Sequence, residues 1–272
     1  MQSVAQVSVK RYEQGIAADA EDQLAVEEPL ELRLSYGETG KKITQIVSVT
    51  MRTPGSDAEL GAGFLFTEGI LQHRNQIRTI EEGGENILLV ELAEDAIPVL
   101  HKAERNFYTT SSCGVCGKAG IDAIKTVSPF PPQADTILIP AELFCPLPQR
   151  LREQQAIFNS TGGLHASALF SFDGDFIMLR EDVGRHNALD KLIGAAFLNK
   201  GLPLHESILL LSGRASFELI QKGAMAGVKI IAAVGAPSSL AVQLASEQDI
   251  TLIGFLRDGR FNIYTHGQRI RL

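Results

Sequence analysis

The most constraining feature of this 272-residue sequence is a set of three short apolar segments near its C-terminal end. Residues 207–211, 229–234 and 251–256 are almost wholly apolar, and two stretches between them, 215–226 and 240–247, have the spacing of amphipathic helices. Apolar strands that alternate with helices form βαβ units, whose crossovers are right-handed and whose sheet is covered on both faces. This end of the chain is therefore predicted to be an α/β domain with a largely parallel sheet.

The first third of the chain predicts a small α+β unit. Residues 1–26 are polar and mixed, which indicates a poorly packed arm or an edge strand. Apolar spacing after the turn at residues 54–57 predicts a helix over 58–71. Strands are predicted around that helix at 31–36, 43–49, 77–80 and 87–92. We therefore expect an N-terminal α+β domain over residues 1–108 and an α/β domain over residues 109–272.

Charge and composition exclude several classes of protein. A net charge of −7 argues against a nucleic-acid partner. The sequence has no apolar run long enough for a transmembrane helix, and its first twenty residues lack the apolar centre of a secretory signal. Three cysteines do not make a secreted disulfide framework. The sequence predicts a cytoplasmic protein without a membrane partner.

A cysteine pair, Cys113 and Cys116, lies in a loop rich in glycine and serine that leads into a predicted helix over 117–127. Amides at a helix N-terminus stabilise an anion, and Lys118 adds positive charge. Such surroundings bring the pKa of a thiol into roughly the 3.5–7.5 range, so that thiolate exists at neutral pH. A thiolate can attack a donor persulfide, hold the outer sulfur and release it when the second thiolate attacks or an acceptor approaches.

Three other chemistries use a similar cysteine motif. A structural zinc site needs four ligands, and only Cys145 remains here, so we expect no metal and a structural role for Cys145. A zinc deaminase has H-x-E and then P-C-x-x-C, whereas Ser112 stands in place of the proline and neither His73 nor His101 is followed by such a glutamate. A thioredoxin-like oxidoreductase places the motif after a first strand, which segment 102–112 does not resemble. The motif alone does not separate sulfur carriage from redox work.

Three strand ends of the predicted sheet carry groups that suit phosphate, and ligands of open α/β sheets bind beyond such ends. Ser212 and Arg214 follow the first strand. Ser238 follows the second, and Arg257 and Arg260 follow the third. Helix N-termini and arginines bind pyrophosphate, while the absence of a P-loop or a dinucleotide fingerprint disfavours ATP hydrolysis and ordinary dinucleotide redox chemistry. These segments, 212–216, 235–239 and 255–260, are called the rim below.

Each of these residues also has a structural explanation. Ser238 suits a helix cap, residues 258–259 suit a hairpin turn, and Arg260 suits a surface ion pair. His186 lies near a predicted helix start, where anion binding and a structural ion pair explain it equally well, and His165 is similar. The coincidence of all three strand ends favours a binding site.

These motifs together resemble the FdhD family of formate dehydrogenase accessory sulfurtransferases, over nearly the whole chain from about Pro29. The most specific part is EDVGRHNALDK at residues 181–191. The other matching segments are 63–70, 112–117, 161–166, 212–216 and 255–260. Leu256-Arg257-Asp258 departs from the Cys-Lys-Pro type of sequence in some members, which leaves the individual roles of Leu256 and Asp258 open and keeps the loop basic.

The resemblance implies a sulfurtransferase that takes sulfur from a cysteine desulfurase and sulfurates the bis-molybdopterin guanine dinucleotide cofactor (Mo-bisMGD) for formate dehydrogenase. It implies that Cys113 carries the persulfide and that Cys116 is its partner in transfer. A guanine nucleotide such as GDP is expected to occupy the same site. The predicted cofactor-binding residues, from the resemblance and the rim together, are Phe255, Leu256, Arg257, Asp258, Gly259, Arg260, Ser238, Ser212, Arg214 and His186.

The resemblance also implies a fold and an assembly. The larger domain is expected to be a three-layer, cytidine-deaminase-like α/β domain without zinc chemistry, and the protein is expected to be a homodimer. One alternative keeps cofactor binding without sulfur carriage. In that case the protein is a molybdenum-cofactor chaperone, and its cysteines form a dimer contact or a metal clip.

Overall fold

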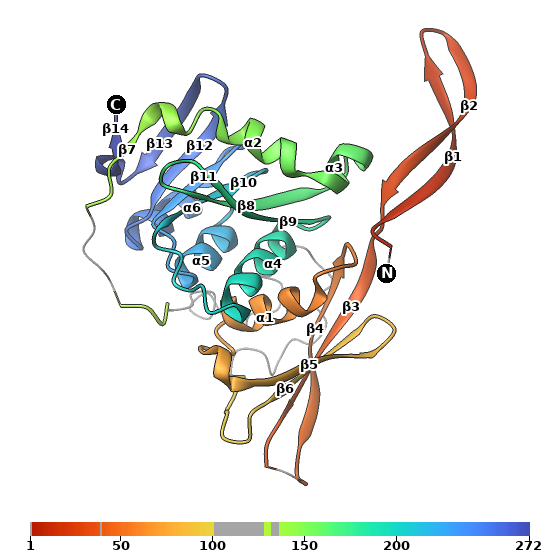
Figure 1. The fold of residues 1–272 in the computed structure, drawn as a ribbon, viewed down its shortest axis with the longest axis vertical. Coiled ribbons are helices and arrows are strands. Elements are labelled where there is room, and N and C mark those ends of the chain that lie inside the picture. The colour runs from red at the N-terminus through yellow and green to blue at the C-terminus, as the bar shows by residue number, and fades with distance from the viewer. Residues whose placement is uncertain (1, 39, 101–127, 132–135) are drawn as a thin grey trace.

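The computed structural model describes residues 2–38, 40–100, 128–131 and 136–272. These residues form stacked layers (Figure 1). A four-stranded sheet packs on a layer of helices, the helices pack on a six-stranded sheet, and short helices cover the far face of that sheet. The mixed α/β class is confirmed, whereas the likeness to cytidine deaminase stays a prediction.

The four-stranded sheet comes from the N-terminal third of the chain. Its order is β4 (Ile43–Arg52), β3 (Glu28–Tyr36), β6 (Ile87–Leu92) and β5 (Ile77–Gly84). Leu30, Leu32 and Leu34 alternate with polar residues along β3, so the strand presents one apolar face to the helix α1 (Asp57–Thr67). The strands and the helix predicted for this region are confirmed, with small shifts at their ends.

The six-stranded sheet has the order β13 (Arg260–Thr265), β12 (Thr251–Arg257), β11 (Ile230–Ala233), β10 (Ser207–Leu211), β8 (His165–Ser171) and β9 (Phe176–Asp182). Only the central strands β10, β11 and β12 run parallel to one another. The prediction of a largely parallel sheet was therefore wrong. Tight hairpins join β8 to β9 and β12 to β13, and a hairpin connection makes neighbouring strands antiparallel.

Three helices cover the inner face of this sheet: α4 (Arg185–Leu198), α5 (Phe217–Met225) and α6 (Ser239–Glu247). On the opposite face lie α2 (Leu147–Gln154) and α3 (Ala156–Thr161), with a small sheet of β7 (Ile139–Pro140) and β14 (Ile270–Arg271) beside them. Phe144, Leu147 and Leu151 pack there against apolar residues of the sheet. A cover on both faces of the sheet was expected, but the sequence analysis predicted no helix at α2 or α3.

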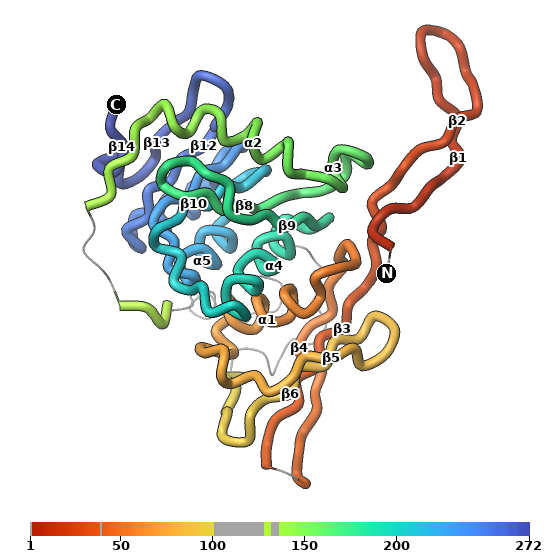
Figure 2. The backbone as a smooth tube through the Cα atoms, in the orientation of Figure 1, coloured from red at the N-terminus to blue at the C-terminus, as the bar shows by residue number. Residues whose placement is uncertain are grey.

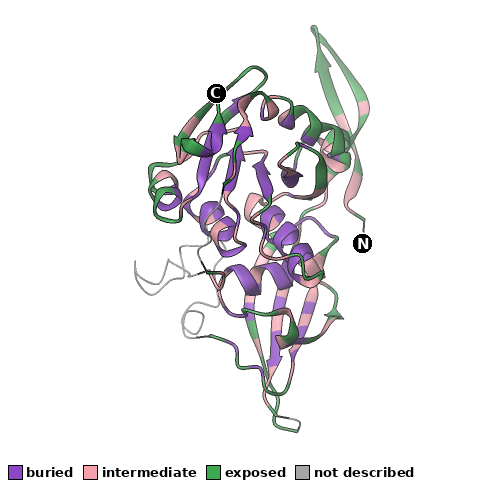
Figure 3. Cartoon of the chain, turned by 60° about the vertical axis from the view of Figure 1, so that its left-hand side comes forward, coloured by how far each residue is buried: buried purple, intermediate pink, exposed green. Residues whose placement is uncertain are grey.

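One hydrophobic core joins the N-terminal sheet to the helix layer. Buried side chains from β3, β6 and α1 belong to the same apolar cluster as those from α4, α5 and the inner face of the six-stranded sheet. Figure 3 shows these buried residues concentrated between the layers. The domain boundary predicted at residues 108–109 lies outside the described residues.

The first described residues form a hairpin arm. Strands β1 (Val4–Glu13) and β2 (Ile16–Ala25) pair only with each other among the described strands, and they project from the body (Figure 2). Tyr12 is 74% exposed and Ile16 is 72% exposed at its tip. The prediction of a poorly packed arm is confirmed. None of the described helices is long and apolar enough to cross a membrane.

Helices α1 and α4 cross at two glycines. A Cβ atom added to Gly63 would overlap the carbonyl oxygen of Asp190, and one added to Gly194 would overlap the carbonyl oxygen of Glu59. The two helix backbones therefore touch without any side chain between them. Glycine is the residue that permits such close backbone approach.

A buried ion pair binds three helices together beside this crossing. Lys222 of α5 donates to both carboxylate oxygens of Asp190 of α4, at 2.9 Å each. Thr67 of α1 donates to Asp190 at 2.7 Å and accepts from Lys222 at 2.9 Å. Glu68 accepts a longer bond from Lys222, at 3.3 Å. Because every polar group has a partner, the charges are retained inside the helix layer.

Gly63→Ala is expected to lower the free energy of unfolding by at least about 2 kcal/mol, because the new methyl group forces the α1 and α4 backbones apart. Urea denaturation followed by circular dichroism measures the change. Gly201→Ala is the matched control, since its Cβ would meet no atom closer than 3.5 Å. A Gly63→Ala protein as stable as the Gly201→Ala protein would contradict the backbone contact.

Candidate functional site

The three predicted segments of the rim meet in the structure. The amide of Gly235 donates to the carbonyl of Gly213 at 2.9 Å, and the amide of Phe255 donates to the carbonyl of Gly235 at 3.0 Å. The amide of Ser238 likewise donates to the carbonyl of Ala215, at 3.0 Å. These bonds continue the pairing of β10, β11 and β12 beyond the strand ends. The prediction that the strand ends lie together is confirmed.

Phe255 has an unusual backbone conformation at this edge. Its φ is +52°, in the left-handed region, and its side chain is 37% exposed. It lies where the pairing of β12 with β13 is irregular. A bulky residue at positive φ costs roughly 1–3 kcal/mol, and such strain concentrates at binding sites.

Leu256 is buried, unlike its neighbour Phe255. It is 0% exposed and packs in the core beneath the six-stranded sheet. Its side chain is therefore not exposed at the rim, and its role in cofactor binding stays a prediction.

The arginines of the rim are exposed. Arg257 and Arg260 are opposite one another across the hairpin turn, with Asp258 and Gly259 exposed between them. Arg214 is also exposed, on the loop after β10. Within the described residues, none of these three arginines forms an ion pair, so the surface ion pair considered for Arg260 is not found there.

The two predicted serines have structural bonds. The Ser212 hydroxyl accepts from the Ala166 amide at 2.8 Å and so holds β8 against β10. The Ser238 hydroxyl accepts from the Ala241 amide at 3.2 Å, as the N-cap of α6. Ser238 nevertheless lies exposed at the rim, and both serines retain a hydroxyl proton that can be donated to a ligand.

His186 lies at the first turn of α4 and faces α5. Its Nε2 atom is 3.3 Å from the Ser216 hydroxyl and 3.5 Å from a carboxylate oxygen of Glu218. Burial alone would raise the pKa of Glu218, but the hydrogen bond and charge of His186 outweigh it, so the pKa is lowered. Of the two explanations considered for His186, the structure therefore contains the structural ion pair, which His186 forms with Glu218.

A second buried ion pair fixes the junction of β9 and α4. Asp182 is 2.7 Å from Lys191, and its carboxylate accepts from the amides of Gly184 at 2.8 Å and Thr53 at 3.2 Å. Burial raises the pKa of Asp182, and the charge of Lys191 opposes that rise. Lys191 also donates to the Thr53 carbonyl at 2.8 Å. The end of β9 and the middle of α4 are thus both attached to Thr53, the residue that follows β4.

His165 and Arg185 also reach this junction, although neither was among the predicted cofactor residues. His165 is opposite Asp182 in the pairing of β8 with β9, and a Cβ atom added to Gly213 of the rim would lie 3.3 Å from its ring. Burial lowers the pKa of His165, and the charges of Arg185 and His186 lower it further. The sequence signal was present, because Arg185 directly follows Gly184 and His165 stands two positions after Gly163.

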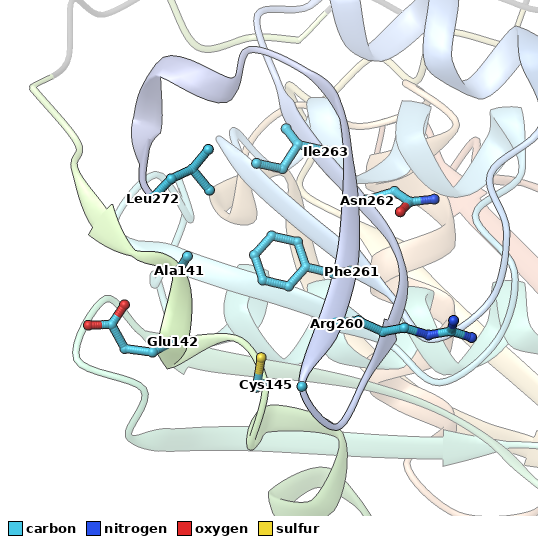
Figure 4. A pocket seen from close by; sticks show the side chains of 9 residues that line it. Ala141, Glu142, Cys145, Arg260, Phe261, Asn262, Ile263 and Leu272 are labelled. Atoms are coloured by element: carbon cyan, nitrogen blue, oxygen red, sulfur yellow. The ribbon is translucent and has the colours of Figure 1, made fainter.

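A hollow of about 740 Å³ lies on the outer side of the β12–β13 hairpin, and Cys145 is part of its wall (Figure 4). Phe261 points into this hollow, whereas the side chain of Arg260 points away from Cys145. The other residues of its wall are Ala141, Glu142, Gly259, Asn262, Ile263 and Leu272. Cys145 is only partly buried, so it is not a core residue.

The cysteine pair itself, Cys113 and Cys116, lies outside the described residues. On its C-terminal side, the Ser128 hydroxyl donates to the Met225 carbonyl at the end of α5, at 3.4 Å. The opposite end of α5, at Phe217, begins at the rim. In the described part of the chain no cluster of His, Cys, Asp or Glu side chains is arranged to hold a metal ion.

Comparison with known proteins gives one consistent result. A model of the FdhD/NarQ family matches residues 25–271. A relative from Mycolicibacterium paratuberculosis, named sulfur carrier protein FdhD, is 50% identical over 99% of this chain and 100% of the relative. A protein of the same name from Sulfolobus acidocaldarius is 38% identical over 99% of both chains.

A solved structure from Desulfotalea psychrophila, described as that of a proposed formate dehydrogenase accessory protein, has the same fold. It is similar with a TM-score of 0.77 and 23% identity, over 99% of this chain and 100% of that chain.

The pKa of His165 is expected to lie below the ordinary histidine value of about 6.5, and Arg185→Gln is expected to raise it, because one of the charges that oppose protonation is removed. An NMR titration of the histidine ring protons measures both. Since folding lowers this pKa, the stability gained from a neutral His165 is present above pH 6.5 and is lost as the pH falls through the folded-state pKa. A His165 pKa at or above 6.5 would contradict the described surroundings.

Proposed function

The chain belongs to the FdhD/NarQ family, and from that membership we propose that it is a sulfur carrier for the maturation of formate dehydrogenase. The name of its relatives, sulfur carrier protein FdhD, supports this role. The observation in the structure that carries the proposal is the rim, where loops from three strands bring exposed arginines together at helix N-termini.

Cys113 is the proposed sulfur-carrying residue. Its thiolate attacks the outer sulfur of a persulfide on a cysteine desulfurase. The new S–S bond forms at Cys113, and the desulfurase cysteine leaves as a thiolate. The product is a persulfide on Cys113, with no net oxidation or reduction.

Cys116 is the proposed partner in release. Its thiolate attacks the inner sulfur of the persulfide, which forms a Cys113–Cys116 disulfide and frees the outer sulfur as sulfide for the molybdenum cofactor. A dithiol reductant then restores both thiols for the next cycle. This sequence of steps accounts for two cysteines at CxxC spacing.

The rim is the proposed site for the guanine nucleotide part of Mo-bisMGD, which is the acceptor of the sulfur. The N-termini of α5 and α6 face this edge, and amides at helix N-termini favour phosphate. Arg214, Arg257 and Arg260 supply guanidinium groups, and exposed Phe255 supplies a ring on which a base can stack. The protein is proposed to act in the cytoplasm as a homodimer.

The length of the chain allows the cysteines to meet this site. Ser128 lies twelve positions after Cys116, and an extended chain of that length spans about 40 Å. Helix α5, which separates the attachment of Ser128 from the rim, has nine residues and is about 14 Å long. The proposal therefore requires no rearrangement of the described layers.

Incubation with a cysteine desulfurase and cysteine is expected to add the mass of one sulfur atom to the protein, measured by intact-mass spectrometry. Cys113→Ala is expected to abolish the addition, because the attacking thiolate is lost. Cys145→Ala is the matched control and is expected to load normally. Normal loading of the Cys113→Ala protein would overturn the assignment of the sulfur-carrying residue.

The double variant Arg257→Gln/Arg260→Gln is expected to weaken GDP binding by at least roughly tenfold, because each guanidinium makes a charge-assisted bond to phosphate. Isothermal titration calorimetry measures the affinity. Arg271→Gln is the control, since Arg271 is exposed on β14, outside the rim. Equal GDP affinity in the double variant and the control would argue against the rim as the nucleotide site.

A further inference from the structure

One face of the hairpin arm formed by β1 and β2 is largely apolar. Residues that are directly opposite in an antiparallel pair have their side chains on the same face, and successive residues of a strand alternate between faces. Val9 is opposite Ala20 in this register, and Arg11 is opposite Ala18. The larger apolar set on this face comprises Val7, Val9, Ile16, Ala18, Ala20 and Leu24. We call this side of the ribbon the arm face.

The other face of the arm is mainly polar. Ser8 donates to Glu21 there at 2.7 Å, and Lys10 lies 3.9 Å from Asp19. Tyr12 is on the same face at the tip. Alternation of apolar and polar residues along both strands is the pattern of a ribbon with one face buried against another layer. The arm face interrupts this pattern only at Arg11, Glu13 and Asp22.

The body of the same chain holds only the base of the arm. The Ser3 hydroxyl donates to the Pro54 carbonyl at 2.9 Å, the Val26 amide donates to the Ser3 carbonyl at 3.0 Å, and β2 runs beside α3. Within the described chain, no hydrogen bond or ion pair joins residues 4–25 to any other residue. The ribbon points away from the layers (Figures 1 and 2), so the arm face stays exposed or half-buried.

A second apolar face lies on the outer side of the four-stranded sheet. The leucines of β3 face α1, so the residues between them, such as Glu31 and Arg33, face away from the helix layer. Val49 of β4 is opposite Glu31 and is 42% exposed, and Met51, two positions on, is 47% exposed. The apolar residues on this outer side, which we call the sheet face, are Ile46, Val49, Met51, Ile87 and Leu89.

The size of the arm face decides what kind of partner it fits. Each strand of the arm has ten residues, so the ribbon is about 34 Å long and about 10 Å wide, and one face measures roughly 340 Å². One arm packed on another surface buries about twice that area, roughly 700 Å², which is no more than a typical crystal contact. Two arms exchanged between two copies bury roughly 1,400 Å², which is within the range of specific interfaces.

We propose that the arm is exchanged in a two-fold dimer, where the arm face of each copy packs on the sheet face of the other. The arm starts beside Pro54, just beyond the end of β4 that carries Met51, and leads away from its own sheet. A two-fold axis near that end gives each arm the partner's sheet face as its surface. A closed two-fold contact uses both apolar faces of both copies and leaves no face for further association.

This inference goes beyond sulfur carriage and gives the proposed homodimer its contact. The FdhD/NarQ family model matches residues 25–271, so the arm precedes the matched part of the chain. In the single chain the ribbon is free to open, and packing on the second copy would hold it in one conformation. The rim lies on other elements, so the proposed nucleotide site is left uncovered by the exchange of arms.

Sedimentation velocity of the full chain is expected to show a dimer. The double variant Val7→Lys/Val9→Lys places two charges on the arm face, and it is expected to weaken dimerisation by at least about tenfold, because the charges would be buried without partners. Gln6→Lys/Ser8→Lys is the matched control. It adds the same charge to the same strand on the opposite face, and it is expected to dimerise as the unsubstituted protein does.

A mixing experiment tests the exchange itself. Val49→Glu lies on the folded body and is expected to weaken the dimer by a similar factor, whether or not the arm variant keeps its ribbon. A mixture of the Val7→Lys/Val9→Lys and Val49→Glu chains is expected to form a heterodimer that is tighter than either variant alone. One of its two contacts is unaltered, and the other sets lysine against glutamate.

The inference is overturned if the unsubstituted chain is a monomer, including one whose arm binds a different protein, or if the arm-face variant dimerises normally. A mixture no tighter than its parts would show that the arm does not pack on the sheet face. Sulfur loading of Cys113 is measured separately. Failed loading of an intact dimer would count against the proposed function, whereas a monomer that loads normally would count against the exchange of arms alone.

Discussion

The contact between the backbones of α1 and α4 is the constraint on which the rest of the structure depends. Gly63 and Gly194 let two helices from distant parts of the sequence touch without intervening side chains. This contact joins the four-stranded sheet to the helix layer in one apolar core. Because the start of α4 also lies beside the rim, the N-terminal sheet becomes part of the support of the candidate site rather than a separate module.

Two buried ion pairs give that support its geometry. Asp190 and Lys222 hold α4 against α5, while Asp182 and Lys191 hold the start of α4 against the end of β9. Buried ion pairs contribute little net stability, but removing one partner leaves an unpaired charge at high cost. We interpret both pairs as devices that fix the direction of α4, whose first turn carries Arg185 and His186. Positioning of charged groups by buried, fully bonded neighbours is what a precise anion site requires.

The features of the fold that local sequence patterns determine could be predicted. The strand at residues 207–211 was predicted with its observed bounds, because an apolar run between turn residues is a local signal. The direction of each strand in the sheet was harder to predict. Strand β8 pairs antiparallel with β10, although a helix lies between them in the sequence, and no local pattern encodes that choice. The rim was predicted because strand ends of a parallel sheet meet. The burial of Leu256 was not predicted, because the face of each side chain depends on the irregular pairing near Phe255. Nothing in the local sequence distinguishes Gly63 from other glycines.

The hairpin arm has a consequence for the dynamics of the molecule. Its base is fixed by bonds from Ser3 to the Pro54 carbonyl and from the Val26 amide to the Ser3 carbonyl, whereas its tip near Tyr12 is exposed on both faces. A two-stranded ribbon alone is only marginally stable in water. The arm should therefore open and exchange its amide protons independently of the layered body, as a separate low-stability unit within a cooperative protein.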